Sequence, residues 1–355
     1  MTPNDREQKV TALIDKLCLT RKLKRSEWVT IIRERTPAAA EHLFELARAV
    51  RIHHYGHDIY IRGLIEFTNY CRNDCYYCGI RKSNANALRY RLSKEDILTC
   101  CEEGYRLGFR TFVLQGGEDG WFTDERLCDI VSSIRAQFPD CAITLSVGER
   151  SYDSYKRLYD AGADRYLLRH ETYDEKHYGR LHPPQLSASH RKQCLWNLKK
   201  IGYQVGTGFM VGSPYQTPEN LADDMLFLAK LNPQMVGIGP FIPHHETPFA
   251  RMPGGTAELT VYMLGLIRLL LPRVLLPATT ALGTIAEDGR EKGILAGANV
   301  IMPNLSPAQV RKKYLLYDNK LCTGDEAAES LNHLRERMEK IGYHITVSRG
   351  DSLNI

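Results

Sequence analysis

Three cysteines lie close together in the segment Cys71-Arg-Asn-Asp-Cys75-Tyr-Tyr-Cys78. The C-x3-C-x2-C spacing supplies three thiolates, whereas a cubane iron–sulfur cluster has four irons to ligate. An electron-transfer cluster is ordinarily closed by four cysteines, so a set of three predicts that one iron is open to a substrate or a cofactor. The alternatives are a zinc knuckle and three unrelated thiols. Structural zinc prefers four ligands, and no second cysteine pair or Cys/His pair stands out downstream.

The wider sequence limits the classes of protein that fit. The chain has 355 residues, a formal net charge of +5 and ten cysteines. Lys and Arg are spread among acids rather than gathered in a stripe, so nucleic-acid binding has little support. No apolar run could span a bilayer, and residues 1–9 have no apolar core behind their charges, so we expect a cytoplasmic protein without a membrane partner. Seven scattered cysteines are expected mostly to be packing residues: Cys18, Cys100, Cys101, Cys128, Cys141, Cys194 and Cys322.

Short strand-like runs alternate with helix-period segments from residue 59 onward. The eight runs are Ile59–Phe67, Thr111–Gln115, Ala142–Val147, Arg165–Arg169, Gln204–Val211, Met235–Phe241, Val274–Ala278 and Ala298–Pro303. Eight β-α units in series predict an α/β fold, a closed (β/α)8 TIM-type barrel, with a doubly wound open sheet as the alternative. Active sites of such barrels lie where the strands end, and the cysteine motif follows the first run.

Helical patterns flank the predicted barrel. Two amphipathic segments, Asp5–Leu19 and Pro37–His53, precede it, and Thr36 is a candidate cap in front of Pro37. No linker or shift of composition divides the rest of the chain. We therefore expect an N-terminal helical extension at residues 1–57, the barrel at 58–310, and a C-terminal helical segment at 311–355 that closes the barrel.

Polar side chains share one face of several predicted strands, because residues of equal parity lie on the same side. They are Arg62, Glu66 and Thr68 on the first strand, Thr144 and Ser146 on the third, and Arg165, Arg169 and Glu171 on the fourth. The outward face of a barrel strand must be apolar, so these side chains are expected to point into the lumen. Several buried cations with few acids in reach predict an anionic ligand. The alternative is an internal salt-bridge network, such as Arg62 with Glu66.

The cysteine spacing resembles the signature of the radical S-adenosylmethionine (SAM) superfamily. That resemblance implies that the amino and carboxylate groups of SAM chelate the open iron, and that an electron from the cluster cleaves SAM to methionine and a 5′-deoxyadenosyl radical. Gln115, Gly116, Gly117 and Glu118 match the element that binds the SAM amino group. Tyr77 matches the aromatic residue that packs on adenine, and Val236–Phe241 resembles the adenine-contacting sixth strand.

Seven stretches resemble one family within that superfamily, the [FeFe]-hydrogenase maturase HydE, and they run through nearly the whole barrel. They are residues 71–81, 114–119, 165–172, 208–217, 237–244, 277–284 and 298–304. The most specific stretches are Arg169-His-Glu-Thr172 and Pro277-Ala-Thr-Thr-Ala-Leu-Gly-Thr284.

The HydE resemblance implies roles for the residues at matching positions. Those implied to bind SAM are Arg169, Glu171 and Arg191, with Gln115 to Glu118, Ser146 and Met302 beside them. Those implied to surround the substrate are Arg62, Thr144, Arg165, Ala278, Thr279, Thr280 and Tyr317. The resemblance also groups Tyr317 with the cluster ligands Cys71, Cys75 and Cys78 as catalytic residues.

The same resemblance implies a reaction and its partners. The HydE family acts on a small cysteine-bound iron–carbonyl–cyanide complex made by a partner radical SAM maturase. Attack of the radical at the cysteine sulfur leads toward a dinuclear precursor of the hydrogenase cofactor. The implied partners are therefore this anionic iron–cysteine complex, other hydrogenase maturases and a reducing electron donor.

One departure from the family concerns a second cluster. Many relatives bind it through C-x7-C-x2-C near the C-terminus, whereas this chain has Cys322 followed by Ser330 and His333. We therefore predict one [4Fe–4S] cluster per chain. Two other functions stay open: a methylornithine synthase-like radical SAM mutase acting on lysine, and a non-catalytic iron–sulfur carrier that needs no SAM pocket. Gly79-Ile-Arg81 and the Thr279–Thr280 loop favour HydE over the mutase.

Overall fold

Strands and helices alternate through the computed structural model, which describes residues 3–321 and 328–354. The strands are β1 (Asp58–Ile61), β2 (Gly63–Thr68), β3 (Thr111–Gly116), β4 (Ala142–Ser146), β5 (Arg165–Leu167), β6 (Gln204–Thr207), β7 (Met210–Val211), β8 (Met235–Val236), β9 (Gly239–Pro240), β10 (Val300–Ile301) and β11 (His344–Thr346). The helices are α1 (Pro3–Thr20), α2 (Arg25–Arg33), α3 (Pro37–Tyr55), α4 (Lys94–Arg106), α5 (Asp124–Gln137), α6 (Tyr152–Asp160), α7 (Glu175–Leu181), α8 (Ala188–Ile201), α9 (Pro218–Leu231), α10 (Ala257–Leu270), α11 (Thr280–Ile285), α12 (Gly289–Leu295), α13 (Ala308–Arg311) and α14 (Leu331–Lys340), with a 3-10 turn at Ala328–Ser330.

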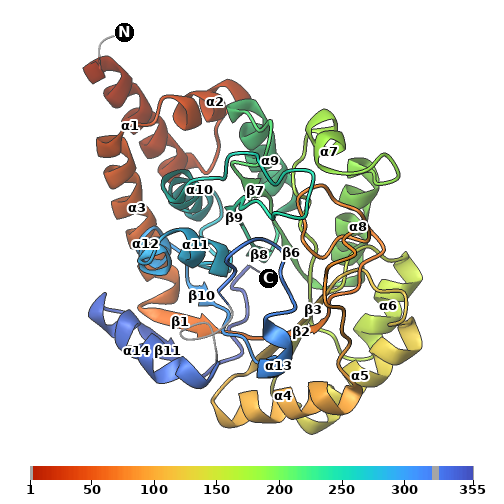
Figure 1. Ribbon diagram of the computed structural model, residues 1–355. Helices are drawn as coiled ribbons and strands as arrows, with labels where there is room; N and C mark the ends of the chain where they lie inside the picture. The colour runs from red at the N-terminus through yellow and green to blue at the C-terminus, as the bar shows by residue number, and fades with distance from the viewer. Residues whose placement is uncertain (1–2, 322–327, 355) are drawn as a thin grey trace.

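The strands close into a barrel. Six of them form a parallel sheet in the order β2-β3-β4-β5-β6-β8. Isolated parallel bridges complete the circle, namely Met235–Leu275, Pro277–Val300 and Leu64–Asn304, and β10 also pairs with β1. Figure 1 shows the strands at the centre with helices around them. The predicted TIM-type barrel is therefore confirmed, and the doubly wound open sheet is wrong.

Several predicted strands are divided in the structure. The run Ile59–Phe67 becomes β1, which lies between β10 and β11, and β2, which pairs with β3. The break falls at Arg62, directly before Gly63, where a Cβ atom would meet Leu305 Cδ1 at 2.1 Å, so the backbone approaches a neighbouring side chain closely. The runs at 204–211 and 235–241 likewise divide, into β6 with β7 and β8 with β9. Residues 274–278 contribute bridges without forming a named strand.

The N-terminal extension has three helices rather than the two that were predicted. Thr36 caps α3 as predicted, because its hydroxyl accepts a hydrogen bond from the N–H of Ala39 at 3.2 Å. Helix α2 was missed. It buries Trp28 and packs against α9, where Arg25 forms an ion pair with Asp223 at 2.6 Å. In Figure 1 these red helices lie together on one side of the barrel.

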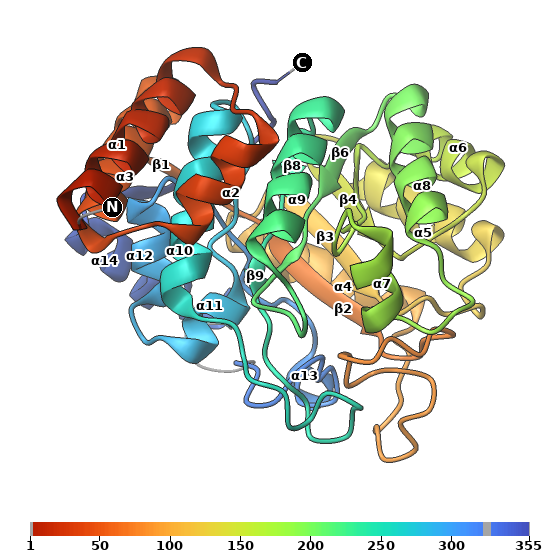
Figure 2. The same cartoon turned by 90° about the horizontal axis from the view of Figure 1, so that it is seen from above.

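The C-terminal segment is less helical than predicted. Helix α14 ends before Gly342, whose φ of +83° suits glycine, and the chain then forms β11 beside β1. The described residues after β11 have no regular secondary structure and lie at the end of the barrel opposite the loop that follows β2 (Figure 2). In the described part of the chain, no helix is long and apolar enough to cross a membrane.

Candidate active site

A cavity of about 370 Å³ lies at the ends of the barrel strands, where the fold predicts chemistry. Its wall includes the segment after β2, the ends of β3 and β4, and the later chain around residue 316. Most of the predicted site residues meet here: Cys71, Cys75, Tyr77, Cys78, Gln115, Gly116, Gly117, Glu118, Ser146, Arg169, Glu171, Arg191, Thr279, Thr280, Met302 and Tyr317.

The loop that carries the cysteines is fixed by one guanidinium group. Arg89 donates hydrogen bonds to four backbone carbonyls, those of Asn69, Ile80, Arg81 and Asn84. Arginine suits this task, because its planar group presents five donors in a rigid arrangement. The loop therefore holds its shape through a side chain rather than through regular secondary structure.

The three cysteines fit an iron–sulfur cluster better than a zinc ion. A tetrahedral zinc ion with sulfurs at 2.3 Å would hold them about 3.8 Å apart. Among residues 3–321 and 328–354, the two groups of three ligand atoms that lie within 4.8 Å of one another do not include these cysteines. Their sulfurs are thus more widely spread, as ligands of separate irons in a cubane are.

The electrostatics of the cysteines also suit metal binding. Burial, followed by the charges of the neighbouring thiolates, raises the pKa of Cys75 well above its ordinary value, and burial raises the pKa of Cys78 to about 12. Without a metal these thiols keep their protons. Metal ligation removes the protons and neutralises the accumulated charge, so the site is suited to a cationic centre.

The Gly-Gly-Glu turn after β3 lies directly against the cysteine loop. A Cβ atom at Gly117 would lie 2.2 Å from the carbonyl oxygen of Tyr70 and 2.8 Å from Cys71 Cβ. Glycine is therefore required at this position. The carboxylate of Glu118 accepts hydrogen bonds from Arg72 Nε at 3.1 Å and from the N–H of Glu149 at 3.1 Å, so it braces the turn.

An alternating row of charges lines another wall of the cavity. Arg169 Nη2 lies 3.2 Å from Glu171 Oε2, as an ion pair without hydrogen-bond alignment. Glu171 is buried and has a φ of +65°, a strained backbone angle for a residue other than glycine. Arg191 donates to the carbonyl of Arg169 at 2.6 Å and to Glu149 at 2.9 Å. These groups could bind an amino acid moiety, whose ammonium and carboxylate need opposite charges.

Tyr77 is oriented by a histidine that the sequence interpretation missed. His182 Nδ1 lies 3.0 Å from the carbonyl of Tyr178, so it donates there and leaves Nε2 to accept from the Tyr77 hydroxyl at 3.1 Å. Burial lowers the pKa of His182 to about 3, so the ring is neutral. Only the aromatic character of the segment and the presence of a downstream histidine could have suggested this pair.

A second group missed from the sequence is the partner of Glu66. Lys320 Nζ lies 2.6 Å from Glu66 Oε1, and Asn304 Nδ2 donates to Oε2 at 2.9 Å. Both Glu66 and Lys320 line the cavity and are almost fully buried. The suggested Arg62–Glu66 pair is therefore wrong, because the acid is neutralised by a lysine 254 positions away.

Four predicted substrate residues do not line the cavity: Arg62, Thr144, Arg165 and Ala278. The expectation of few acids in reach is wrong for Arg165. It lies at the start of β5 and donates to Asp351 Oδ1 at 2.7 Å, and also to Gln204, Thr111 and the carbonyls of Arg349 and Gly350. For Arg165 the alternative prediction of an internal salt bridge is therefore confirmed, and its acidic partner is Asp351 near the end of the chain.

Comparisons with known proteins show the family of the chain. A family model described as the radical SAM superfamily matches residues 65–228. Over 302 residues the chain is 44% identical to the [FeFe] hydrogenase maturase subunit HydE of Thermotoga maritima. The alignment covers 85% of this chain and 86% of that protein. The chain belongs to the HydE family of radical SAM enzymes. Membership implies a [4Fe–4S] cluster and SAM, for which the cysteines and the charged wall are suited.

Other relatives are more distant from this HydE family member. The 3-methylornithine synthase of Methanosarcina acetivorans is 28% identical over 85% of this chain and 84% of its own length. A crystal structure of methylornithine synthase has a TM-score of 0.82 at 25% identity and covers 94% of this chain and 97% of that one. A structure of HydG, a maturase of the [FeFe]-hydrogenase, has a TM-score of 0.80 at 19% identity and covers 95% of this chain and 76% of that one, which shows a shared fold.

Proposed function

We propose that this protein uses a 5′-deoxyadenosyl radical to convert a small anionic iron–carbonyl–cyanide complex, bound through cysteine, during assembly of the [FeFe]-hydrogenase cofactor. Similarity to the Thermotoga HydE supports the pathway. The proposed supplier of the substrate and the recipient of the product are other hydrogenase maturases, and a reducing protein is the proposed electron donor.

The observation that carries the proposal is a set of buried polar atoms without hydrogen-bond partners among the described residues. They are Nε and Nη2 of Arg62 and the hydroxyls of Thr144 and Thr279. Burying such groups unpaired is costly, more so for a guanidinium. A polar anion that accepts hydrogen bonds would satisfy Thr279 on the cavity wall, and would satisfy Arg62 and Thr144 by reaching past that wall into the barrel. An iron complex with cyanide ligands has this chemistry.

The proposed roles follow the walls of the cavity. Cys71, Cys75 and Cys78 would hold the one [4Fe–4S] cluster. Arg169, Glu171 and Arg191 would hold the polar groups of SAM, with Tyr77, Gln115 to Glu118, Ser146 and Met302 around the rest of the molecule. When bound, the cluster and SAM supply the radical.

Some of the proposed substrate residues lie on the cavity wall, and others are buried in the barrel outside it. Thr279, Thr280 and Tyr317 are on the cavity wall. Arg62, Thr144 and Ala278 are buried in the barrel away from that wall. The proposed task of Arg62 is to bind the negative charge. Arg165 is not proposed as a direct contact, because its donors are already engaged.

Electron paramagnetic resonance of the reduced, reconstituted protein, with and without SAM, tests the first half of the proposal. We expect SAM to shift the cubane signal. Release of 5′-deoxyadenosine is then measured with a synthetic cysteine-bound iron–carbonyl–cyanide complex and, separately, with lysine. Turnover of the iron complex supports the proposal, turnover of lysine instead supports the mutase, and an unshifted signal without nucleoside supports the carrier.

An Arg62→Met variant tests the second half. The change removes the unpaired nitrogens and keeps an apolar side chain in a buried position. We expect the SAM-shifted signal to persist, while formation of 5′-deoxyadenosine loses its stimulation by the iron complex. Equal stimulation in the variant and the parent protein would argue against an anion at Arg62.

A further inference from the structure

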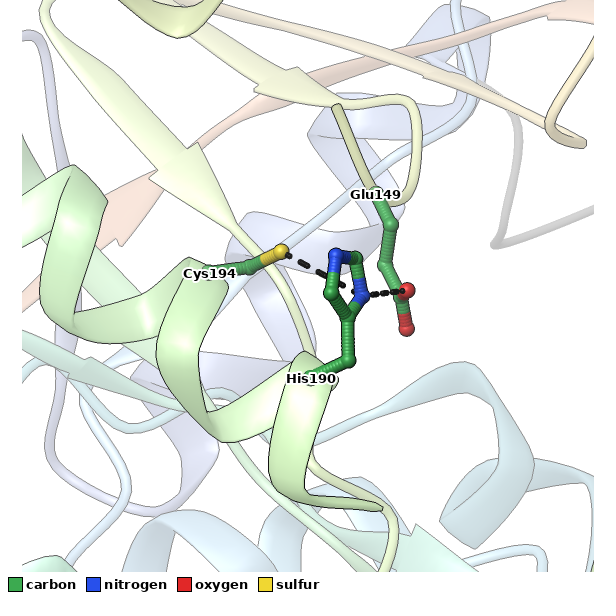
Figure 3. A group of neighbouring side chains, drawn as sticks. All are labelled: Glu149, His190 and Cys194. Atoms are coloured by element: carbon green, nitrogen blue, oxygen red, sulfur yellow. Dashed lines mark hydrogen bonds and ion pairs between the residues drawn. The ribbon is translucent and has the colours of Figure 1, made fainter. Parts of the chain in front are cut away.

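Three side chains with metal-binding atoms lie close together (Figure 3). They lie outside the cavity, next to Arg191, which we propose binds SAM. Glu149 lies in the loop between β4 and α6, and His190 and Cys194 lie one helical turn apart on α8. His190 Nδ1 is 2.7 Å from Glu149 Oε2 and 3.9 Å from Cys194 Sγ. All three ligand atoms lie within 4.8 Å of one another.

This cluster does not have the geometry of a nucleophilic Cys-His-Glu relay. In such a relay the imidazole contacts the nucleophile with one nitrogen and the carboxylate with the other. Here both neighbours approach the same atom, Nδ1, as the dashed lines in Figure 3 show. Burial also raises the pKa of the Cys194 thiol, which disfavours a free thiolate. The three ligand atoms instead lie within 4.8 Å of one another, close enough to be drawn around a single ion.

We propose that Glu149, His190 and Cys194 form a binding site for a borderline divalent cation of the zinc type. One thiolate, one imidazole and one carboxylate match the ligand preferences of zinc. With Zn–S near 2.3 Å and Zn–N near 2.0 Å, a tetrahedral site sets the sulfur and nitrogen about 3.6 Å apart. The 3.9 Å separation found here needs only a small shift.

The surroundings leave room for the ion and for a further ligand. The His190 side chain is 61% exposed, so its ring can turn and release the hydrogen bond to Glu149 as the metal enters. A hollow of about 470 Å³ adjoins the site and is lined by Glu149 and His190, among others. Three protein ligands with an open fourth position are typical of zinc sites that retain water or an exchangeable ligand.

Glu149 links this site to Arg191, one of the residues that we propose bind SAM. Its Oε2 faces His190, while its Oε1 accepts a hydrogen bond from Arg191 Nη1 at 2.9 Å. A metal bound through Oε2 therefore leaves the contact with Arg191 in place and fixes the carboxylate that makes it. Occupancy would position Arg191, and the metal itself would not touch the reacting atoms.

The test measures zinc and iron per chain on the reconstituted holoprotein after equilibration with zinc chloride and a competing chelator. Loss of a ligand should weaken zinc binding at least about 10-fold, since even removal of a supporting outer residue costs that much. We expect Cys194→Ala and His190→Gln each to show this loss with unchanged iron. Cys128→Ala is the matched control, a half-buried cysteine on α5 outside the cluster, and should bind zinc like the parent protein.

Zinc K-edge X-ray absorption identifies the ligands. We expect one sulfur scatterer with nitrogen and oxygen in the parent protein, and none in Cys194→Ala. Three sulfur scatterers would mean that zinc occupies the cluster cysteines and would overturn the proposal, as would equal zinc binding in all the variants or none in the parent protein. His190→Gln changes an exposed side chain, so it remains informative if Cys194→Ala fails to fold.

Discussion

The carboxylate of Asp351 lies 2.7 Å from Nη2 of Arg165, so the end of the described chain neutralises a fully buried cation in the barrel. Gln204 Nε2 donates to the same carboxylate at 3.0 Å, and the Thr111 hydroxyl donates to the carbonyl of Arg349 at 2.8 Å. Thr111, Arg165 and Gln204 are the first residues of β3, β5 and β6. The tail therefore seals the end of the barrel opposite the cavity.

Asp351→Asn should destabilise the protein by about 1–3 kcal/mol, less than for a fully buried pair because the acid is partly exposed. Although burial alone would raise the pKa of Asp351, hydrogen bonding to Arg165 holds it below its ordinary value. The stabilisation is therefore complete above about pH 4, near the unfolded-state pKa, and declines as the pH falls further. Urea unfolding of both proteins at pH 7 and below pH 4 measures this.

The control for Asp351 is Asp288→Asn, which breaks an exposed ion pair with Lys292. Its effect should be below about 0.5 kcal/mol. If Asp351→Asn were no more destabilising than this control, the tail would not be a structural part of the barrel.

Arg89→Ala should weaken retention of the cluster, because four carbonyls of the cysteine loop lose their common donor. We expect iron and sulfide per chain to fall severalfold after gel filtration and chelator treatment. Lys82→Ala changes an exposed side chain of the same loop and should retain iron like the parent protein. Equal retention by both variants would show that the loop does not depend on Arg89.

Tyr77→Phe should weaken SAM binding about 2- to 10-fold, the range for loss of one hydrogen bond that orients a ring. Because burial keeps His182 neutral, with a pKa of about 3, this hydrogen bond should not change between pH 6 and 8. SAM titrations followed by electron paramagnetic resonance across that range would measure both effects. A Tyr77-dependent change near pH 6.5 would contradict the neutral His182.

Lys320→Met should destabilise the protein by about 3–5 kcal/mol, because it leaves the buried Glu66 carboxylate without its cation. The double variant Glu66→Gln with Lys320→Met should recover much of the loss, since neither charge remains. Denaturant unfolding of the two single variants and the double variant gives the coupling energy. Additive effects would mean that the two side chains do not interact.

Iron and sulfide analysis should give about one cubane per chain, because the chain has Ser330 and His333 where many relatives have cysteines. Cys322 lies outside the described residues, so this count stays a prediction. Two cubanes per chain would contradict it, and replacement of Cys71, Cys75 and Cys78 by alanine should remove the cluster altogether.

The sequence was sufficient for the barrel because alternation of strands and helices is a local pattern. Strand parity was wrong for Thr68, because a register shift between Glu66 and Thr68 interrupts the alternation, and the Thr68 hydroxyl donates to Asp119 at 2.8 Å instead of lining the cavity. Parity also does not give depth. Arg165 and Arg169 have the same parity, yet four residues of extended chain separate them by about 13 Å. Arg169 thus reaches the cavity, while Arg165 lies toward the opposite end.

Contacts between distant segments could not be predicted from local patterns. Nothing near Glu66 or Arg165 in the chain indicates Lys320 or Asp351 as partners. The cation-site ligands show the same limit. The four-residue spacing of His190 and Cys194 is visible in the sequence, whereas Glu149 joins them only because it lies just before α6, and α6 packs against α8 in the fold.

The two closures of the barrel come from a single late stretch of the chain. Leu316, Tyr317 and Lys320 cover the cavity, and residues 349–351 seal the opposite end. A nascent chain that has emerged only to residue 310 already carries all three cluster cysteines and every residue proposed to bind SAM. It lacks the residues that line the cavity from the final segment and those that pair with Arg165 at the opposite end, so we expect a protected site only after synthesis of the final segment.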